Sequence, residues 1–542
     1  MSRLPRHASP ADLPRRALLR GLAASAGVAA ASSWMPNELG IVVRAQADGP
    51  VAQTTAGKVR GYMSDGIHAF KGIRYGADTA PPRRFLPPVP PDPWQGVRDA
   101  TTFGLIAPRP GGNEPMSEDC LHLNLWTPGL RDGKKRPVMV WFHPGAYSGG
   151  HSNDPDTDGT RLAKRGDVVV VTVNHRLNAF GYLYLAEFGG PELADSGNVG
   201  MLDLILSLQW VRDNIAEFGG DPGRVLIFGQ SGGGAKSAVL MAMPAARGLF
   251  HGVITMSGQQ ITASRTTTAT THAKQLLDAL KLSPANVNVL KTLPMADLAK
   301  VARAPRYLGP VKDGRSVPND PFEPHAPALS ADIPMILGNT HDETRGLIGR
   351  SDPTLFALTW EQVPGALEKH VPQFIGSLDR QMIVDSYRTW YPHYSPSDVF
   401  FSATTAARSW RGQVIEANRR AAQPAGVAPT WVFQLDWPSP EDGGKWGAYH
   451  GLDVPLCFDN VARPGSRIAT PVAQQVADRM SATWIAFART WNPNNASLPP
   501  WPTYDLATRA TMVFDAQTRV VNDPRGNERR LFDPVVYVQP GT

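Results

Sequence analysis

The chain has 542 residues, of which 42 % are hydrophobic and 19 % are charged, a composition that excludes a mainly disordered or fibrous chain. Its formal net charge is +6, but residues 1–47 carry six arginines and two acids, so 48 of the 54 basic and 46 of the 48 acidic residues lie beyond them. A nearly neutral body gives no reason to expect nucleic acid as a partner.

The first 47 residues carry the pattern of an export signal. Arg15-Arg16 precedes a run of small apolar residues at 18–32, and Ala-Gln-Ala at 45–47 forms a small-x-small cleavage site. The paired arginines indicate the twin-arginine route, which exports folded proteins. We therefore expect cleavage after Ala47 and a periplasmic or secreted mature chain. No apolar run long enough to span a membrane follows this signal.

Six apolar runs in the mature chain predict strands, because each is short, rich in Val, Ile, Leu and aromatic residues, and bounded by turn residues. They lie at residues 138–142, 168–173, 225–228, 253–256, 334–337 and 431–435. Near-continuous apolar runs of this kind are typical of a parallel sheet that is covered on both faces.

Helical patterns lie between these runs. Leu residues and other apolar residues from 204 to 215 recur at spacings of 4, 3 and 4, which places them on one helix face, and Gly-Gly-Asp-Pro at 219–222 ends that helix. Strands that alternate with helices predict an α/β fold. Residues 262–330 and 352–425 look helical and loop-rich. We expect them to cover the carboxyl edge of the sheet, where ligands bind in open α/β folds.

The sharpest motif is Gly-Gln-Ser-Gly-Gly at residues 229–233, which follows a predicted strand and precedes a helix-compatible run at 235–243. A strand-to-helix turn this tight holds its serine in a strained conformation and exposes the hydroxyl, while the small flanking residues allow close chain passage. An ordinary glycine-rich turn can carry the same pattern, but the strand and helix around it favour the catalytic interpretation. We therefore predict that Ser231 is a nucleophile.

A serine nucleophile needs a general base within hydrogen-bond reach and an acid that orients the base. On a strand–turn–helix of this kind, the acid and then the histidine follow the serine along the chain. His-Asp-Glu at residues 341–343 follows one predicted strand, and His450 lies a short loop beyond another. Both strand ends would meet Ser231 at one sheet edge. The pattern leaves His341 and His450 open as the base, with His450 favoured.

The third catalytic element follows the predicted strand at 138–142. Its sequence is His-Pro-Gly-Ala-Tyr at residues 143–147. Loops in this position supply backbone N–H groups that stabilise an oxyanion, and the N–H directly after the nucleophile, that of Gly232, supplies another. Each such donor contributes roughly 3 kcal/mol to transition-state stabilisation. A plain Pro-Gly turn is the alternative interpretation.

Residues 117–124 (Ser-Glu-Asp-Cys-Leu-His-Leu-Asn) match the E-D-C-L-x-L-N signature of type-B carboxylesterases, the cholinesterase-like branch of the α/β hydrolases. Further matches to this family lie at residues 71–75, 174–177, 179–181, 218–222, 228–231, 484–490 and 501–504. Because these matches run along almost the whole mature chain, the sequence resembles this family as one catalytic domain over residues 48–542.

The resemblance implies the α/β-hydrolase fold, with a large, mostly parallel central sheet flanked by helices and with helical and loop insertions over the active-site edge. It also implies a serine carboxylesterase that acts on small-molecule esters through an acyl-enzyme and needs neither a cofactor nor a metal. The family's acid and histidine match Glu343 and His450, which would complete a triad with Ser231. Its oxyanion-hole donors match Gly145, Ala146 and Gly232.

The sequence near the predicted site departs from the family pattern in three segments. The usual H-G-G-G is His-Pro-Gly-Ala at 143–146, and the methyl group of Ala146 predicts poor turnover of bulky tertiary-alcohol esters. Gln230 replaces the usual acidic residue before the nucleophile, which argues against cationic choline esters. Asp453 stands where glutamate is usual, and we expect this change to be mild.

The cysteines also depart from the family pattern. The chain has two, Cys120 and Cys457. The residue that is normally bridged to Cys120 would fall near Ala107, so the usual disulfide is absent. We therefore predict that both thiols are free.

Two other functions fit parts of the sequence. Carbamates, amides or aryl esters suit the same triad as carboxylic esters. A non-catalytic binding or adhesion protein is the alternative from another class, since some members of this fold have lost catalysis. Such members typically lack the nucleophile, whereas Ser231, Glu343 and His450 are all present here. The sequence gives no prediction of acyl preference, alcohol preference or oligomeric state.

Overall fold

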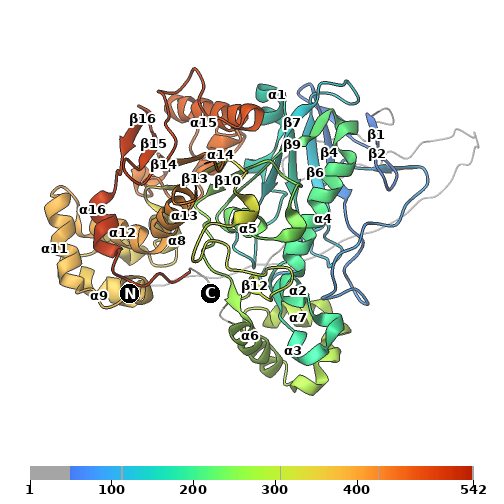
Figure 1. Cartoon of the computed structure of the whole chain (residues 1–542), viewed down its shortest axis with the longest axis horizontal. Coiled ribbons are helices and arrows are strands. Elements are labelled where there is room, and N and C mark those ends of the chain that lie inside the picture. Colours follow the sequence, from blue (N-terminus) through green and yellow to red (C-terminus); the bar gives the residue numbers. More distant parts are fainter. Residues whose placement is uncertain (1–48, 112–113, 306, 425, 540–542) are drawn as a thin grey trace, which may run out of the picture. The chain divides into compact units, whose positions relative to one another are not determined.

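The computed structural model describes residues 49–111, 114–305, 307–424 and 426–539 (Figure 1). The predicted twin-arginine signal and its cleavage site at Ala47 lie outside these residues. Within the described residues, no helix is both long and apolar enough to cross a membrane. The same residues contain no group of three or more His, Cys, Asp or Glu side chains placed to hold a metal ion.

The main sheet of the described chain has 11 strands, and its centre is parallel. In spatial order the strands are β16 (Arg519–Asn522), β15 (Ala510–Phe514), β14 (Thr430–Leu435), β13 (Met335–Thr340), β10 (Gly252–Met256), β9 (Gly220–Gln230), β7 (Arg136–Phe142), β8 (Val169–Val173), β6 (His122–Thr127), β4 (Ile67–Arg74) and β3 (Tyr62–Ser64). Neighbours from β8 across to β15 pair in parallel, and neighbours at both margins pair antiparallel. The predicted α/β architecture is confirmed.

The six predicted strands correspond to β7, β8, β9, β10, β13 and β14. Five of them differ from the prediction by at most three residues at either end. Strand β9 begins earlier, at Gly220, which pairs with Arg136 beyond an irregularity in the ladder. Gly219 adopts a left-handed conformation with φ of 73° after α4 (Val199–Asn214) and a further 3₁₀ turn. The predicted helix stop therefore leads directly into a strand.

Helices cover both faces of the sheet, because the central strands are apolar on both. Along β7, Val138 and Val140 pack into the core that includes α4, whereas Met139 and Trp141 pack into the core that includes α15 (Pro471–Thr490). All four side chains are fully buried. Close packing on both faces fixes the strand ends from which the site residues project.

Two groups of helices and loops cover the edge of the sheet that carries the site. The first contains α6 (Thr266–Ala279), α7 (Met295–Val301), β11 (Ser264–Arg265) and β12 (Val311–Lys312). The second has its own apolar core and contains α9 (Val363–His370), α10 (Pro372–Ile375), α11 (Arg380–Trp390), α12 (Pro396–Thr404), a π-helix (Thr405–Trp410) and α13 (Arg411–Ala421). Figure 1 shows them as separate groups. Both reach the pocket of Ser231, as predicted, through Tyr307 and Arg408.

Shorter elements complete the described fold. They are β1 (Val51–Gln53), β2 (Lys58–Arg60), β5 (Val97–Asp99), α1 (Thr160–Gly166), α2 (Asn178–Tyr182), α3 (Ala186–Gly189), α5 (Gly232–Leu240), α8 (Glu343–Leu347), α14 (Asp453–Cys457) and α16 (Gly526–Phe532). Strands β1, β2 and β5 form a small separate sheet. Helix α5 continues directly from the turn after β9 and is buried at every position.

Both cysteines are free, as predicted, and both are buried. They lie in different apolar cores, since Cys120 packs with the α4 core and Cys457 with the α15 core. Titration without reductant is expected to count two thiols in the denatured chain and almost none in the native chain, because burial blocks the reagent. A denatured chain that shows no reactive thiol would contradict this prediction.

Candidate active site

Ser231 lies at a sharp turn between β9 and α5. Its backbone angles are φ 54° and ψ −125°, a strained conformation for a residue with a side chain. The neighbouring glycines make the turn possible. A Cβ atom on Gly233 would lie 1.8 Å from the backbone oxygen of Phe142, and one on Gly229 would lie 2.4 Å from the carbonyl carbon of Gly233. The tight strand-to-helix turn predicted from the motif is therefore present.

His450 and Glu343 are hydrogen-bonded to each other through His450 Nδ1 and Glu343 Oε2. Glu343 begins α8 just beyond the end of β13, and His450 follows β14 by a loop. Asp342 joins these two segments, because its N–H donates to the carbonyl of Ala448 at 2.9 Å and its Oδ2 accepts from the Ala448 N–H at 3.0 Å. The loop that carries His450 is thus held against the loop that carries Glu343.

The second oxygen of Glu343 is fully engaged. Its Oε1 accepts hydrogen bonds from the Thr340 N–H at 2.9 Å, from Asn339 Nδ2 at 3.2 Å and from the hydroxyl of Ser257. Burial alone would raise the pKa of Glu343, but the charge of His450 and these hydrogen bonds outweigh it, so its pKa lies below the usual value. Glu343 is a buried carboxylate whose ionised form is stabilised.

Ser257 was not predicted from the sequence. It follows β10 directly and has φ of 50°, which turns its hydroxyl toward Glu343. It also lines the same pocket as Ser231. The signal that could have indicated it is a Ser-Gly pair at the end of a predicted strand that lies next to the nucleophile's strand.

His341, the other candidate for the base, takes part in a different pair. Its Nδ1 lies 3.3 Å from Asp342 Oδ1. Burial opposes the imidazolium, but the charge and the hydrogen bond of Asp342 outweigh burial and raise the pKa of His341. Among the described residues, His450 and not His341 lines the pocket of Ser231. Of the two histidines that the pattern left open, His450 is therefore the one placed beside Ser231.

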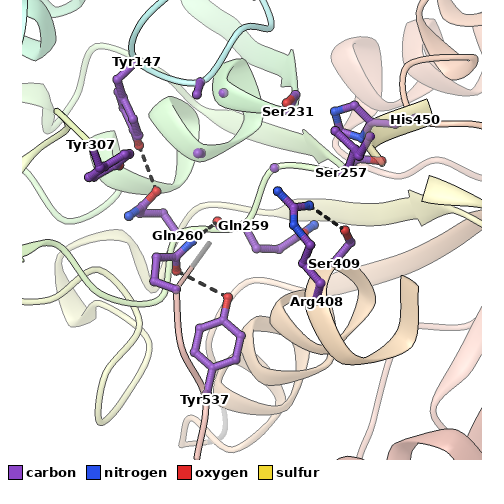
Figure 2. Close-up of a pocket in the computed structure, with 16 residues that line it drawn as sticks. Tyr147, Ser231, Ser257, Gln259, Gln260, Tyr307, Arg408, Ser409, His450 and Tyr537 are labelled. Atoms are coloured by element: carbon purple, nitrogen blue, oxygen red, sulfur yellow. Dashed lines mark hydrogen bonds between the residues drawn. The ribbon is translucent and has the colours of Figure 1, made fainter. Parts of the chain in front are cut away.

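Ser231 and His450 line one pocket of about 180 Å³ (Figure 2). In the described chain the Ser231 hydroxyl makes no hydrogen bond, and the His450 ring lies against Gln230, whose Nε2 is 3.2 Å from His450 Nε2 and 3.4 Å from Nδ1. Catalytic hydrogen bonds are often long or poorly aligned before substrate binds. Gln230, the residue that departs from the family pattern, thus contacts the candidate base.

The predicted oxyanion loop bends sharply beside the nucleophile. Gly145 has φ of 103° and Ala146 has φ of 52°, and the N–H of Gly149 donates to the carbonyl of Gly145 at 2.9 Å. A Cβ atom on Gly232 would lie 2.5 Å from the Ala146 nitrogen, so the backbones of these two residues touch. Ala146 and Gly232 line the pocket, whereas Gly145 is not among the described lining residues.

A buried lysine that was not predicted from the sequence supports this loop. The Lys236 ammonium, carried by α5, donates to the backbone carbonyl of His143 at 3.2 Å. Burial lowers the pKa of Lys236 to about 7. Burial, followed by the charge of Lys236, also lowers the pKa of His143 and of His175, whose rings stack 4.7 Å apart. The sequence signal that could have indicated Lys236 is a lysine within an otherwise apolar helical run.

Asp453, which replaces the family's usual glutamate, is an unusual buried acid. It begins α14, and neither side-chain oxygen makes a hydrogen bond of normal geometry within the described chain. Burial and then the charge of Glu343 raise the pKa of Asp453 to about 8. The folded chain therefore holds a proton here that the unfolded chain releases near pH 4. Because its folded pKa is raised, Asp453 lowers the stability of the fold at neutral pH relative to acidic pH, and the expectation that replacing the usual glutamate is a mild change stays a prediction.

The variant Asp453→Asn tests this stability effect. Because the folded pKa is raised, wild-type stability falls as the pH increases from about 4 to about 8. The variant lacks this loss, so its thermal unfolding midpoint is expected to exceed that of wild type by a margin that grows between pH 5 and pH 8. The exposed control Asp213→Asn should show no such trend. A constant margin for Asp453→Asn would contradict the prediction.

Known proteins are similar to this chain in sequence and in fold. A family model described as the carboxylesterase family matches residues 48–532. The chain is 34 % identical to the para-nitrobenzyl esterase of Bacillus subtilis (strain 168), over 89 % of this chain and 98 % of that protein. It is 32 % identical to the phenmedipham hydrolase of Pseudarthrobacter oxydans, over 88 % and 97 %. The crystal structure of a Geobacillus stearothermophilus carboxylesterase matches with a TM-score of 0.80 and 36 % identity, over 89 % of this chain and all of that one. The chain therefore belongs to the carboxylesterase family and has the α/β-hydrolase fold.

Proposed function

We propose that this chain hydrolyses carboxylic esters to an acid and an alcohol, with Ser231 as nucleophile, His450 as general base and Glu343 as the acid that orients His450. The observation that supports this proposal most is a strained serine and a histidine in one pocket, with a buried carboxylate on the histidine's other nitrogen. Groups in these roles suit acyl transfer. The names of the relatives, which include several esterases, point to the same bond type.

The reaction proceeds in two halves. Ser231 Oγ attacks the ester carbonyl while His450 Nε2 accepts the hydroxyl proton, and the imidazolium then gives this proton to the departing alcohol. The acyl group is now bound to Ser231. A water molecule gives a proton to His450, attacks the acyl carbon and releases the acid, and the proton returns to Ser231. Glu343 holds the Nδ1 proton and stabilises the imidazolium in both halves.

The backbone supplies the oxyanion donors in this proposal. The N–H groups of Ala146 and Gly232 are the best placed, because both residues line the pocket and their backbones touch. Gly145 remains the third candidate donor from the family resemblance. The loop is fixed before substrate arrives by the bond from Lys236 to His143. Donors that need no reorganisation stabilise the transition state most effectively.

A fluorophosphonate probe tests the nucleophile directly. We expect stoichiometric labelling of Ser231, identified by peptide mass spectrometry, together with loss of activity on p-nitrophenyl esters.

Acetate esters of n-butanol and tert-butanol test the role of the Ala146 methyl group, and we expect the tert-butyl ester to be the much poorer substrate. Absence of labelling, with no ester cleaved, would favour the non-catalytic alternative. Amide and carbamate substrates in the same panel decide the alternative bond types.

We also propose that residues 1–47 direct export by the twin-arginine route and that the mature catalytic domain begins after Ala47. The paired arginines and the small-x-small site support this proposal. N-terminal sequencing of the protein recovered from the periplasm or medium tests it. A mature chain that retains Arg15-Arg16 would contradict it.

A further inference from the structure

Arg408 places a guanidinium group in the pocket of Ser231. It belongs to the π-helix Thr405–Trp410, which separates α12 from α13. Figure 2 shows its side chain extending from that helix into the pocket, below the segment that carries Ser257. Short π-helical segments are rare and often occur at functional sites. The helix thus presents a cation where the substrate of the proposed reaction would bind.

This cation has no carboxylate partner within the described residues. Arg408 Nη1 donates to the Ser409 hydroxyl at 3.2 Å, and the guanidinium lies 6.0 Å from the centre of the Phe374 ring. The carboxylate whose charge influences it is Glu343, which is fully buried and already bonded to His450 and to three other donors. Arg408 therefore differs from the many arginines of this chain that form ion pairs with Asp or Glu.

The rest of the pocket does not neutralise Arg408. The described residues that line it are Ala146, Tyr147, Ser231, Gly232, Ala235, Ser257, Gly258, Gln259, Gln260, Tyr307, Leu347, Arg408, Ser409, His450, Tyr537 and Gln539. None of these is Asp or Glu, and Arg408 and His450 are the two that can carry positive charge. Two of the neighbouring polar groups form a hydrogen bond with each other, since the Tyr147 hydroxyl donates to Gln260 Oε1 at 3.0 Å.

A partly buried guanidinium favours an anionic partner. Burial lowers the pKa of Arg408, but arginine stays protonated in proteins, so the charge persists in the pocket. Removing such a charge from water is costly unless an opposite charge compensates for it. The planar fork of N–H donors matches a carboxylate especially well and forms short, charge-assisted hydrogen bonds with it.

We propose that Arg408 binds a free carboxylate of the substrate, so that the preferred esters are anionic, such as half-esters of dicarboxylic acids or esters of hydroxy acids. This inference rests on the proposed ester hydrolysis at Ser231. The carboxylate can belong to the acyl part or to the alcohol part of the ester. Both supply the same chemistry to Arg408, and the two arms of the experiment distinguish them.

The experiment compares matched anionic and neutral esters. In the acyl arm, monoethyl adipate is compared with ethyl adipamate, in which an amide replaces the carboxylate. In the alcohol arm, 4-acetoxybutyrate is compared with 4-acetoxybutyramide. For wild type we expect the kcat/KM of the anionic ester to exceed that of its neutral partner in at least one arm. In Arg408→Gln this ratio should fall by about 10- to 100-fold, the range for a charge-assisted hydrogen bond.

Two further variants separate charge recognition from a structural role. Arg408→Lys keeps the positive charge and should recover part of the ratio. Arg411→Gln removes a guanidinium from the adjoining helix that is not a lining residue of this pocket, and it should keep the wild-type ratio. Circular dichroism checks that every variant is folded.

Each outcome decides the inference. If wild type cleaves the neutral esters without preferring the anionic ones, the proposed function stands and the role of Arg408 is overturned. If Arg408→Gln loses activity on both esters equally, Arg408 supports Glu343 or the fold, and the inference is again overturned. If no ester is cleaved and the fluorophosphonate labels nothing, the proposed function itself fails, together with the inference.

Discussion

Replacement of Ser231 by alanine is expected to lower kcat for ester hydrolysis by about 10⁶-fold, the loss measured when a triad nucleophile is removed from a serine hydrolase. The reason is chemical, because no acyl-enzyme can form without the hydroxyl group. The fold should be retained, since the Ser231 hydroxyl makes no hydrogen bond within the described chain and alanine removes one oxygen atom. Initial rates on p-nitrophenyl acetate, corrected for spontaneous hydrolysis, measure the effect.

Ser257→Ala is the matched control for this loss. Ser257 also lines the pocket, but its hydroxyl donates to Glu343 and is one of three donors to the same oxygen. Its removal should cost roughly tenfold in kcat, as for the loss of one hydrogen bond to a charged group. If Ser231→Ala retained wild-type turnover, or if Ser257→Ala caused the larger loss, the nucleophile would have to be reassigned.

The centre of the fold could be predicted because it is encoded locally. Short apolar runs located the strands that carry the site, and the motif around Ser231 located its turn. The strands of the two antiparallel margins were not predicted, because their sequence signals are weaker. Strand β6 is fully buried yet carries Asn124, whose amide donates to Ser152 and Thr172 from distant segments. Strand β16 is only partly buried, so no apolar run marks it.

A site residue could be predicted from the sequence where its residue type and a neighbouring predicted strand are enough to identify it, as for Ser231. Glu343 and His450 needed the family resemblance, because His341 and Asp342 lie next to the same strand end and form a pair of their own. Ser257, Lys236 and Arg408 depend on contacts between elements that lie far apart in the chain. The roles of these three residues are set by packing, which no local pattern reports.

Glu343→Gln is expected to lower kcat by about 10⁴-fold while leaving the fold intact, as the equivalent acid-to-amide change does in a serine-protease triad. The structure explains why kcat is expected to fall in this variant. Glu343 Oε1 accepts from the Thr340 N–H, from Asn339 and from Ser257, so that position must remain an oxygen. In the variant the amide group must therefore direct its NH₂ toward His450 Nδ1.

An NH₂ group in that position changes the tautomer of His450. It can only donate, so Nδ1 must be the unprotonated nitrogen, and the proton moves to Nε2. A protonated Nε2 cannot accept the proton of Ser231, and the base is lost. The variant also removes the negative charge that stabilises the imidazolium. The prediction is checked by kcat on p-nitrophenyl acetate, with fluorophosphonate labelling slowed in parallel.

Two variants make this prediction specific to Glu343. Glu343→Asp keeps the charge but shortens the side chain, so it should lose less activity than Glu343→Gln. Asp453→Asn alters the other buried acid near Glu343. Because Asp453 is mainly protonated at neutral pH, this variant should keep kcat at neutral pH within about tenfold of wild type. If Asp453→Asn instead abolished turnover and Glu343→Gln retained it, the orienting acid would be Asp453. His450 would then have to exchange its hydrogen bond with Glu343 for one with Asp453, an arrangement that differs from the present structure.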